Sequence, residues 1–255
     1  MKFKFQMAEN FKQYSLCYDL LYSEKDYKGE VDYVIKKLHA FKHEIKTILN
    51  LGSGTGKHDE YFLKSGYESF GIELSLEMAK IAQSKGLFSQ VGDISNFNLN
   101  RKFDCAVSLF HVVSYLNTYE QIINMFKCVY SHLEDNGIFL FDVWFTPAVY
   151  SQIPEKRVKL IENDSLRINR IATPVIDYEN NIVQVEYQID AIDKKYCKSF
   201  SFSEIHKMRH FGVSEMKILA ELGGLSLIDS EEFLTKNMLS DKTWGACFTF
   251  IKNGK

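Results

Sequence analysis

The sequence predicts an α/β protein: a doubly wound parallel sheet with a separate antiparallel sheet inserted late in the chain. Two observations indicate this fold. Between residues 45 and 145, short apolar runs alternate with segments whose apolar residues recur every three or four positions. Between residues 157 and 205, apolar and polar residues alternate one by one. The first pattern is typical of buried parallel strands joined by helices, and the second of half-buried antiparallel strands.

Each element of the parallel part follows from its local pattern. Residues 9–40 read as helical, because apolar residues lie at helical spacing. Strands are expected in IKTILNL (45–51), ESFGIEL (68–74), FSQVGDI (88–94), FDCAVSLF (103–110) and IFLFDVWF (138–145). Helices are expected between them in KHDEYFLKSG (57–66), SLEMAKIAQSKG (75–86) and TYEQIINMFKCVYSHLEDNG (118–137). Gly66 and Gly86 are suitable helix ends, and Ser75 is a suitable N-cap.

The alternating part predicts an antiparallel meander with turns at residues 177–181 and 193–195. Its strands are RVKLIE (157–162), SLRINRIATPVI (165–176), NIVQVEYQIDAI (181–192) and KSFSFSEIH (198–206). A helix in SEMKILAELGG (214–224) and strands near 225–233 and 245–252 return the chain to the first sheet. Three regions are therefore expected: N-terminal helices plus core (1–146), an inserted sheet serving as a lid or dimer contact (147–205), and the rest of the core (206–255).

Composition limits the partners of the protein. The 255 residues carry a formal net charge of −2, so no electrostatic attraction to nucleic acid or an anionic membrane is expected. The five cysteines form no CxxC pair, which favours free thiols in a reducing cytoplasm. The N-terminus lacks the apolar core of a signal peptide, and the longest uncharged apolar run is too short to span a bilayer. A soluble cytoplasmic protein is expected.

The stretch LNLGSGTG (49–56) places three glycines directly after the first strand of the parallel part. A phosphate-binding P-loop has four residues between its first glycine and its Gly-Lys pair, and the pair is followed by Ser or Thr. Here three residues separate Gly52 from Gly56–Lys57, and His58 follows the pair. A dinucleotide-binding turn needs a third glycine where Lys57 stands. The remaining reading is a turn that brings the backbone close to a ligand without a phosphate, or simply a strand-to-helix turn.

Two carboxylates favour a ligand. Glu73 closes the second strand a little over twenty residues after the first, where an acid accepts hydrogen bonds from ribose hydroxyls. Asp93 closes the third strand and has the acceptor oxygens that an exocyclic amine such as adenine N6 requires. The alternatives are a surface glutamate and a helix N-cap. Together these acids describe a site for an adenosyl group without a pyrophosphate.

LNLGSGTG, GIELSLEM and VGDI resemble the first three motifs of the class I methyltransferases that use S-adenosylmethionine. The resemblance spans residues 45–145 and implies a Rossmann-like sheet, S-adenosylmethionine as methyl donor, S-adenosylhomocysteine as product and no metal. Asn50 stands where that superfamily usually has an acid that contacts the methionine end. The positions that the resemblance assigns to cofactor binding are Asn50, Gly52, Ser53, Gly54, Gly56, Glu73, Leu74, Met78, Asp93, Ile94, Leu109 and Tyr27.

The flanking segments resemble the bacterial sugar N,N-dimethyltransferases and uncharacterised methyltransferases found with surface-polysaccharide genes. They include YDLLYSEKDYKGEVDYV, SLFHVVSYL, FDVWFTPAVY and FSFSEIHKMRHF. This resemblance implies N- or O-methylation of a small polar acceptor, most plausibly a nucleotide-linked sugar or a surface-polysaccharide precursor. A phosphoryl or amide decoration of such a precursor is the alternative acceptor. SLFHVVSYL lacks the [D/N]PP[Y/F] turn of enzymes that methylate base amines, which argues against a nucleic-acid substrate.

Five residues are candidates for catalysis or acceptor binding. Tyr18 lies on the segment that, by resemblance, folds over the cofactor. His111 and Tyr115 follow the fourth strand, where cofactor and acceptor meet in the superfamily. His206 is a candidate base, and Arg209 a candidate partner for a phosphate or carboxylate.

Structural roles stay open for these candidates. They are helix packing for Tyr18 and Tyr27, a satisfied core position for His111, and an ion pair with Glu204 or Asp142 for Arg209. Two other functional classes also stay open: a nicotinamide-dependent oxidoreductase, which the glycine spacing disfavours, and an adenosyl-binding protein without activity.

Overall fold

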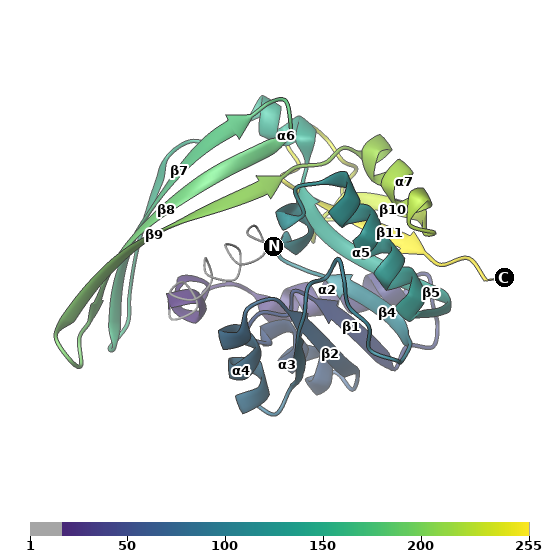
Figure 1. The fold of residues 1–255 in the computed structure, drawn as a ribbon, viewed down its shortest axis with the longest axis horizontal. Coiled ribbons are helices and arrows are strands. Elements are labelled where there is room, and N and C mark those ends of the chain that lie inside the picture. Colours follow the sequence, from purple (N-terminus) through teal and green to yellow (C-terminus); the bar gives the residue numbers. More distant parts are fainter. Residues whose placement is uncertain (1–16, 255) are drawn as a thin grey trace.

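The computed structural model describes residues 17–254 and contains two separate sheets (Figure 1). The core sheet has seven strands in the order β10-β11-β5-β4-β1-β2-β3. Its strands are β1 (Thr47–Leu51), β2 (Glu68–Glu73), β3 (Phe88–Val91), β4 (Phe103–Ser108), β5 (Leu133–Trp144), β10 (Ser226–Glu232) and β11 (Gly245–Ile251). The first five pair in parallel, as the alternating pattern predicts, whereas β11 is antiparallel to both β5 and β10.

Helices cover both faces of the core sheet, as expected for a doubly wound fold. They are α2 (Tyr27–His39), α3 (Lys57–Lys64), α4 (Leu76–Ser84), α5 (Tyr119–His132) and α7 (Val213–Leu222). Successive residues of β1 show the two layers: Ile48 packs with α2 and α3, and Leu49 packs with α5 and α7. Ser75 caps α4 by accepting from the Met78 amide, as its position predicts. Two short elements were not predicted: the 3-10 helix η1 (Val112–Tyr115) and α6 (Thr146–Ser151).

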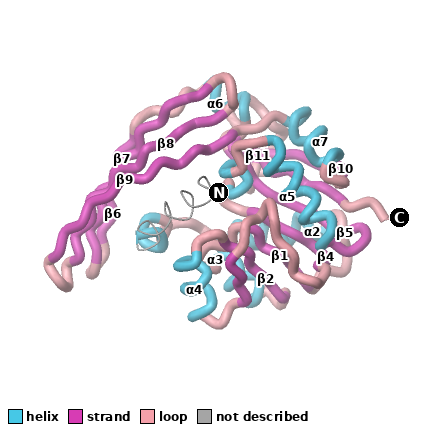
Figure 2. The backbone as a smooth tube through the Cα atoms, in the orientation of Figure 1, coloured by secondary structure: helices cyan, strands magenta, loops and turns pink. Residues whose placement is uncertain are grey.

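The inserted sheet is a four-stranded antiparallel meander that curves beside the core (Figure 2). Its strands are β6 (Arg157–Glu162), β7 (Leu166–Asp177), β8 (Ile182–Asp193) and β9 (Lys198–Arg209). β9 runs three residues past His206, the predicted end of this strand, so the inserted sheet ends at Arg209.

Apolar contacts join the inserted sheet to the rest of the molecule at two places. Cys17 and Leu21, in a helical turn at residues 17–21, pack on Ile168 and Ile189. At the other end, Val149 of α6 packs on the sheet. The part of the first predicted helix before Cys17 lies outside the described residues. Over residues 17–254, no helix is long and apolar enough to span a membrane.

Candidate active site

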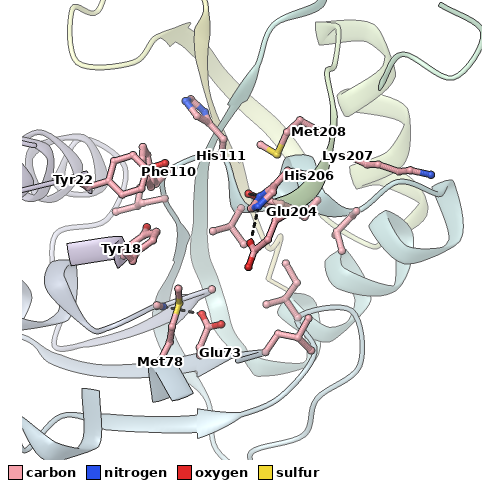
Figure 3. Close-up of a pocket in the computed structure, with 18 of the residues that line it drawn as sticks. Tyr18, Tyr22, Glu73, Met78, Phe110, His111, Glu204, His206, Lys207 and Met208 are labelled. Carbon is pink, nitrogen blue, oxygen red and sulfur yellow. Dashed lines mark hydrogen bonds and ion pairs between the residues drawn. The ribbon is translucent and has the colours of Figure 1, made fainter. Parts of the chain in front are cut away.

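A cavity of about 1200 Å³ lies between the carboxyl ends of the core strands and the inserted sheet. Figure 3 shows its centre, with Glu73 and Met78 on the core side and Glu204 and His206 on the sheet side. Most residues predicted for the site line this cavity: Tyr18, Tyr27, Gly52, Ser53, Gly54, Glu73, Leu74, Met78, Asp93, Ile94, Leu109, His111, Tyr115 and His206. Asn50, Gly56 and Arg209 are not among the residues lining it.

The three glycines of the first loop have different tasks. All have positive φ, of 73°, 58° and 81° for Gly52, Gly54 and Gly56, a region in which other residues are strained. A Cβ on Gly52 would lie 2.4 Å from a methyl group of Val112, and one on Gly56 would lie 2.2 Å from Leu87. A Cβ on Gly54 would meet no atom of the described chain within 4 Å. Only Gly54 therefore leaves open space toward the cavity, while its neighbours are needed for packing.

Glu73 is held at the edge of the cavity by backbone amides. Its Oε2 accepts from the Gly54 amide and its Oε1 from the Ser75 amide, both at 2.8 Å. The residue is 7% exposed, and burial raises its pKa even though these amides favour the charged form. Each carboxylate oxygen has a second lone pair, so Glu73 can accept from two ligand hydroxyls without losing its amide bonds.

Polar groups around the same end of the cavity fit an adenosyl ligand. Asp93 Oδ1 accepts from the amide and the hydroxyl of Ser95 at 2.8 and 2.7 Å, which fixes its carboxylate at the end of β3. Tyr27 Oη and Ser53 Oγ are buried and have no hydrogen-bond partner among residues 17–254. Both residues line the cavity, although neither of these two oxygen atoms is itself exposed to it.

Asn50 differs from its predicted role. Its side chain is buried, and its amide donates to Asp59 Oδ2 at 2.8 Å. Asp59 also accepts from Ser69, yet burial keeps its pKa above the ordinary value. Asn50 thus connects β1 to α3 instead of reaching the cavity. His58, beside this pair in α3, is hydrogen-bonded to Glu30 at 2.7 Å.

His111 lies at the mouth of the core sheet, in a loop fixed by Asp142. Phe110 and His111 both have positive φ, and their amides donate to the two oxygens of Asp142 at 2.7 and 3.2 Å. His111 Nδ1 is 2.7 Å from Asp142 Oδ2. Burial would raise the pKa of Asp142, but the His111 imidazole, the His111 amide and Lys25 together hold it below its ordinary value. In Figure 3 the His111 ring points away from Glu73 and Met78.

Tyr115 and His206 meet across the cavity. The Tyr115 hydroxyl is 2.8 Å from His206 Nδ1, and His206 Nε2 is 3.2 Å from Glu204 Oε2. Burial raises the pKa of Tyr115 well above its ordinary value, as it does for Tyr18. The sequence offered Glu204 only as a partner for Arg209, so its place in this chain was missed.

Arg209 does not contribute to the cavity. Its guanidinium donates to Glu215 at 2.8 Å and to the Asn117 carbonyl at 3.1 Å, and it stacks 4.2 Å from the Tyr119 ring. Arg209 therefore forms an ion pair, which was the alternative to acceptor binding, but its partner is Glu215 and not Glu204 or Asp142. Arg209 attaches the end of β9 to the core.

The sheet side of the cavity contains residues that the sequence did not single out. Arg157, Arg170, Tyr187 and Lys207 line it. The Arg170 guanidinium lies over the rings of Tyr22 and Tyr187, at 5.9 and 5.1 Å. The available signal was the alternation of apolar and polar residues along β7 and β8. It placed Arg170 and Tyr187 on one face of the sheet, but it could not show that this face turns toward the core. Among residues 17–254, no three His, Cys, Asp or Glu side chains gather as a metal site requires.

Comparison with known proteins finds similarity to methyltransferases. Residues 48–137 match a methyltransferase domain family. A relative from Streptomyces venezuelae, dTDP-3-amino-3,4,6-trideoxy-alpha-D-glucopyranose N,N-dimethyltransferase, is 28% identical and covers 82% of this chain and 88% of its own. The structure of a S-adenosylmethionine-dependent methyltransferase from Clostridium acetobutylicum matches with a TM-score of 0.79 and 23% identity, over 96% of this chain and 99% of its own.

The structure of S-adenosylmethionine-bound CalS10, an amino pentose methyltransferase from Micromonospora echinaspora, shares the fold as well. Its TM-score is 0.75 at 20% identity, over 95% of this chain and 98% of its own. The chain is therefore an S-adenosylmethionine-dependent methyltransferase with a methyltransferase domain over residues 48–137, and sugar N,N-dimethyltransferases are among its relatives.

Proposed function

We propose that this enzyme methylates a nitrogen of a nucleotide-linked amino sugar. One observation carries the proposal: the cavity has two chemically different sides within a single volume. The core side has the acids Glu73 and Asp93, and the sheet side has the cations Arg157 and Arg170. At about 1200 Å³ the cavity exceeds the roughly 300–1000 Å³ of an ordinary ligand pocket, which leaves room for a donor and an acceptor together.

The core side would hold the cofactor. Glu73 would accept from the ribose hydroxyls, Asp93 from the adenine amine, and the open space at Gly54 would let the ligand approach the backbone. When bound, S-adenosylmethionine supplies a methyl group on a positively charged sulfur, already activated for displacement. The chain then has to align the acceptor and exclude water, and such positioning contributes about 7–11 kcal/mol in well-oriented reactions.

The sheet side would hold the acceptor. Arginine binds phosphate oxygens through two parallel hydrogen bonds, so Arg157 and Arg170 suit the diphosphate of a nucleotide-linked sugar. The relative from Streptomyces venezuelae carries a dTDP-linked amino sugar in its name, which favours N- over O-methylation here. The product would serve a surface polysaccharide or a secondary metabolite. The free thiols of all five cysteines suit a reaction in the cytoplasm.

We also propose that the enzyme forms a homodimer through the outer face of the inserted sheet. Val158, Leu160 and Val175 are exposed by 64%, 57% and 62%, although their types are usually buried. Their positions in β6 and β7 put them on the face opposite to Arg170. β6 pairs only with β7 within the described residues, so this apolar surface borders an open sheet edge.

Calorimetric titration followed by an activity assay tests the proposed reaction. S-adenosylmethionine and S-adenosylhomocysteine should bind the wild-type protein, and Glu73→Gln should weaken both by roughly tenfold or more, the worth of a charged hydrogen bond. Glu77→Gln, at a partly exposed acid in the first turn of α4, is the matched control. With dTDP-3-amino-3,4,6-trideoxyglucose added, mass spectrometry should show one and then two methyl groups. Binding without transfer to any amino or hydroxylated sugar would favour the inactive alternative.

A further inference from the structure

A chain of three polar side chains crosses the cavity from the core to the inserted sheet. Tyr115 belongs to η1, at the carboxyl end of β4, whereas His206 and Glu204 belong to β9. The Tyr115 hydroxyl lies 2.8 Å from His206 Nδ1, and His206 Nε2 lies 3.2 Å from Glu204 Oε2. His206 and Glu204 are buried, and all three line the cavity. Figure 3 shows Glu204 and His206 joined on the side of the cavity that faces Glu73.

The direction of these hydrogen bonds follows from what each group can donate. A carboxylate only accepts, so His206 Nε2 carries the proton that is shared with Glu204. His206 Nδ1 then has a lone pair and accepts from the Tyr115 hydroxyl. Burial raises the pKa of Tyr115 and keeps its proton in place. A tyrosine oxygen has two lone pairs, so Tyr115 can accept a hydrogen bond from a molecule in the cavity while it donates to His206.

We propose that Tyr115, His206 and Glu204 form a proton relay that deprotonates the acceptor amine. The relay rests on the proposed function, because an ammonium group has no lone pair with which to attack a methyl group. As the acceptor ammonium gives a proton to Tyr115 Oη, the tyrosine gives its own proton to His206 Nδ1. The resulting imidazolium is stabilised by the Glu204 carboxylate, and no electrons are gained or lost.

The freed lone pair is then available to form the new N–C bond as the methyl–sulfur bond breaks, with that electron pair going to sulfur. The methylated amine again carries a proton, so a second methylation requires the relay again. In this scheme Tyr115 touches the acceptor, whereas His206 acts through Tyr115. Glu204 is a positioning residue that selects the tautomer of His206.

Several groups surround the relay. Tyr187 of β8 packs edge-on against the His206 ring, with ring centres 4.9 Å apart. Cys17, from the helical turn at residues 17–21, is close enough to Glu204 that the carboxylate contributes to the raised pKa of the thiol, although burial is the larger cause. Tyr18 and Glu73 face Tyr115 from the core side. A pH profile alone would not identify the relay, so the test compares variants.

Kinetics with dTDP-3-amino-3,4,6-trideoxyglucose give the first readout. Tyr115→Phe and Glu204→Gln should lower kcat about 100-fold at neutral pH, within the range of general base catalysis, with the affinity for S-adenosylhomocysteine unchanged. The loss should shrink to a few-fold as the pH rises above the pKa of the acceptor amine, which is then already deprotonated. Tyr119→Phe and Glu186→Gln, outside the cavity, are the matched controls. Equal loss at every pH would overturn the relay.

Nitrogen-15 spectra of the histidine rings give a second readout that needs no turnover. His206, identified by the signal lost in His206→Gln, should carry its proton on Nε2, and Tyr115→Phe should move its Nδ1 shift. A proton on Nδ1, or a spectrum unaffected by Tyr115→Phe, would overturn the relay even if the sugar is methylated. Failure to methylate any amino sugar, with these spectra as expected, would instead count against the proposed acceptor alone.

Discussion

Two buried carboxylates at the ends of core strands have opposite pKa shifts. Glu73 and Asp142 each accept hydrogen bonds from backbone amides, which lower the pKa, and burial acts in the opposite direction on both carboxyl groups. At Glu73 the effect of burial is larger than that of the amides, so its pKa is raised. At Asp142 the imidazole of His111, 2.7 Å away, and a more distant Lys25 add enough attraction to reverse the shift. A raised pKa in a cavity is typical of a functional group, whereas Asp142 stabilises the loop that carries Phe110 and His111.

Asp142→Asn tests this role through the pH dependence of stability. A lowered pKa in the folded protein gives stability that is complete above the unfolded value, about 3.9, and is lost as the pH falls through the folded value. Asp142→Asn should therefore cost about 1–3 kcal/mol at pH 7, and the difference from wild type should narrow below about pH 4. Thermal unfolding from pH 7 to pH 3 measures it, with the exposed Asp164→Asn as control. A difference that does not depend on pH would contradict the assignment.

At the level of the element, the loop between β1 and α3 separates packing from ligand binding. Alanine at Gly52 adds a clash with Val112 to the cost of positive φ, whereas alanine at Gly54 adds only the backbone cost, about 1–2 kcal/mol. Gly52→Ala should thus lower the melting temperature more than Gly54→Ala.

The two glycine variants should rank the other way in cofactor binding. Gly54→Ala places a methyl group in the open space beside Glu73 and should weaken S-adenosylhomocysteine binding by tenfold or more in a protein that remains folded. Melting curves and calorimetric titration of both variants measure the two rankings. A Gly54→Ala protein that binds like wild type would remove Gly54 from the site.

Most strands and longer helices could be predicted from the sequence because their signals are local. Five apolar runs predicted β1 to β5, and the alternation at 157–205 predicted the second sheet. The short η1 and α6 were missed because four and six residues carry no periodic signal. The prediction that Arg209 binds the acceptor failed for a different reason: its contacts with Glu215 and the Tyr119 ring form only through tertiary packing. The place of Glu204 in the cavity could not be predicted either, because it depends on which face of β9 turns toward the core.

At the level of the whole molecule, the proposed dimer through the outer face of the inserted sheet can be tested. If Val158, Leu160 and Val175 pair with a second copy, the wild-type protein should sediment at about twice the 29.6 kDa of one chain. Leu160→Asp would place an unpaired charge in that interface, which is costly to bury, and should give single chains. Tyr196→Asp, equally exposed but near the β8–β9 turn, should remain dimeric. The folded state of each variant is checked by circular dichroism.

A wild-type protein that sediments as one chain at every concentration would contradict the proposed dimer. The cavity would then be complete within a single chain, because every group assigned to the relay and to cofactor binding comes from the same chain.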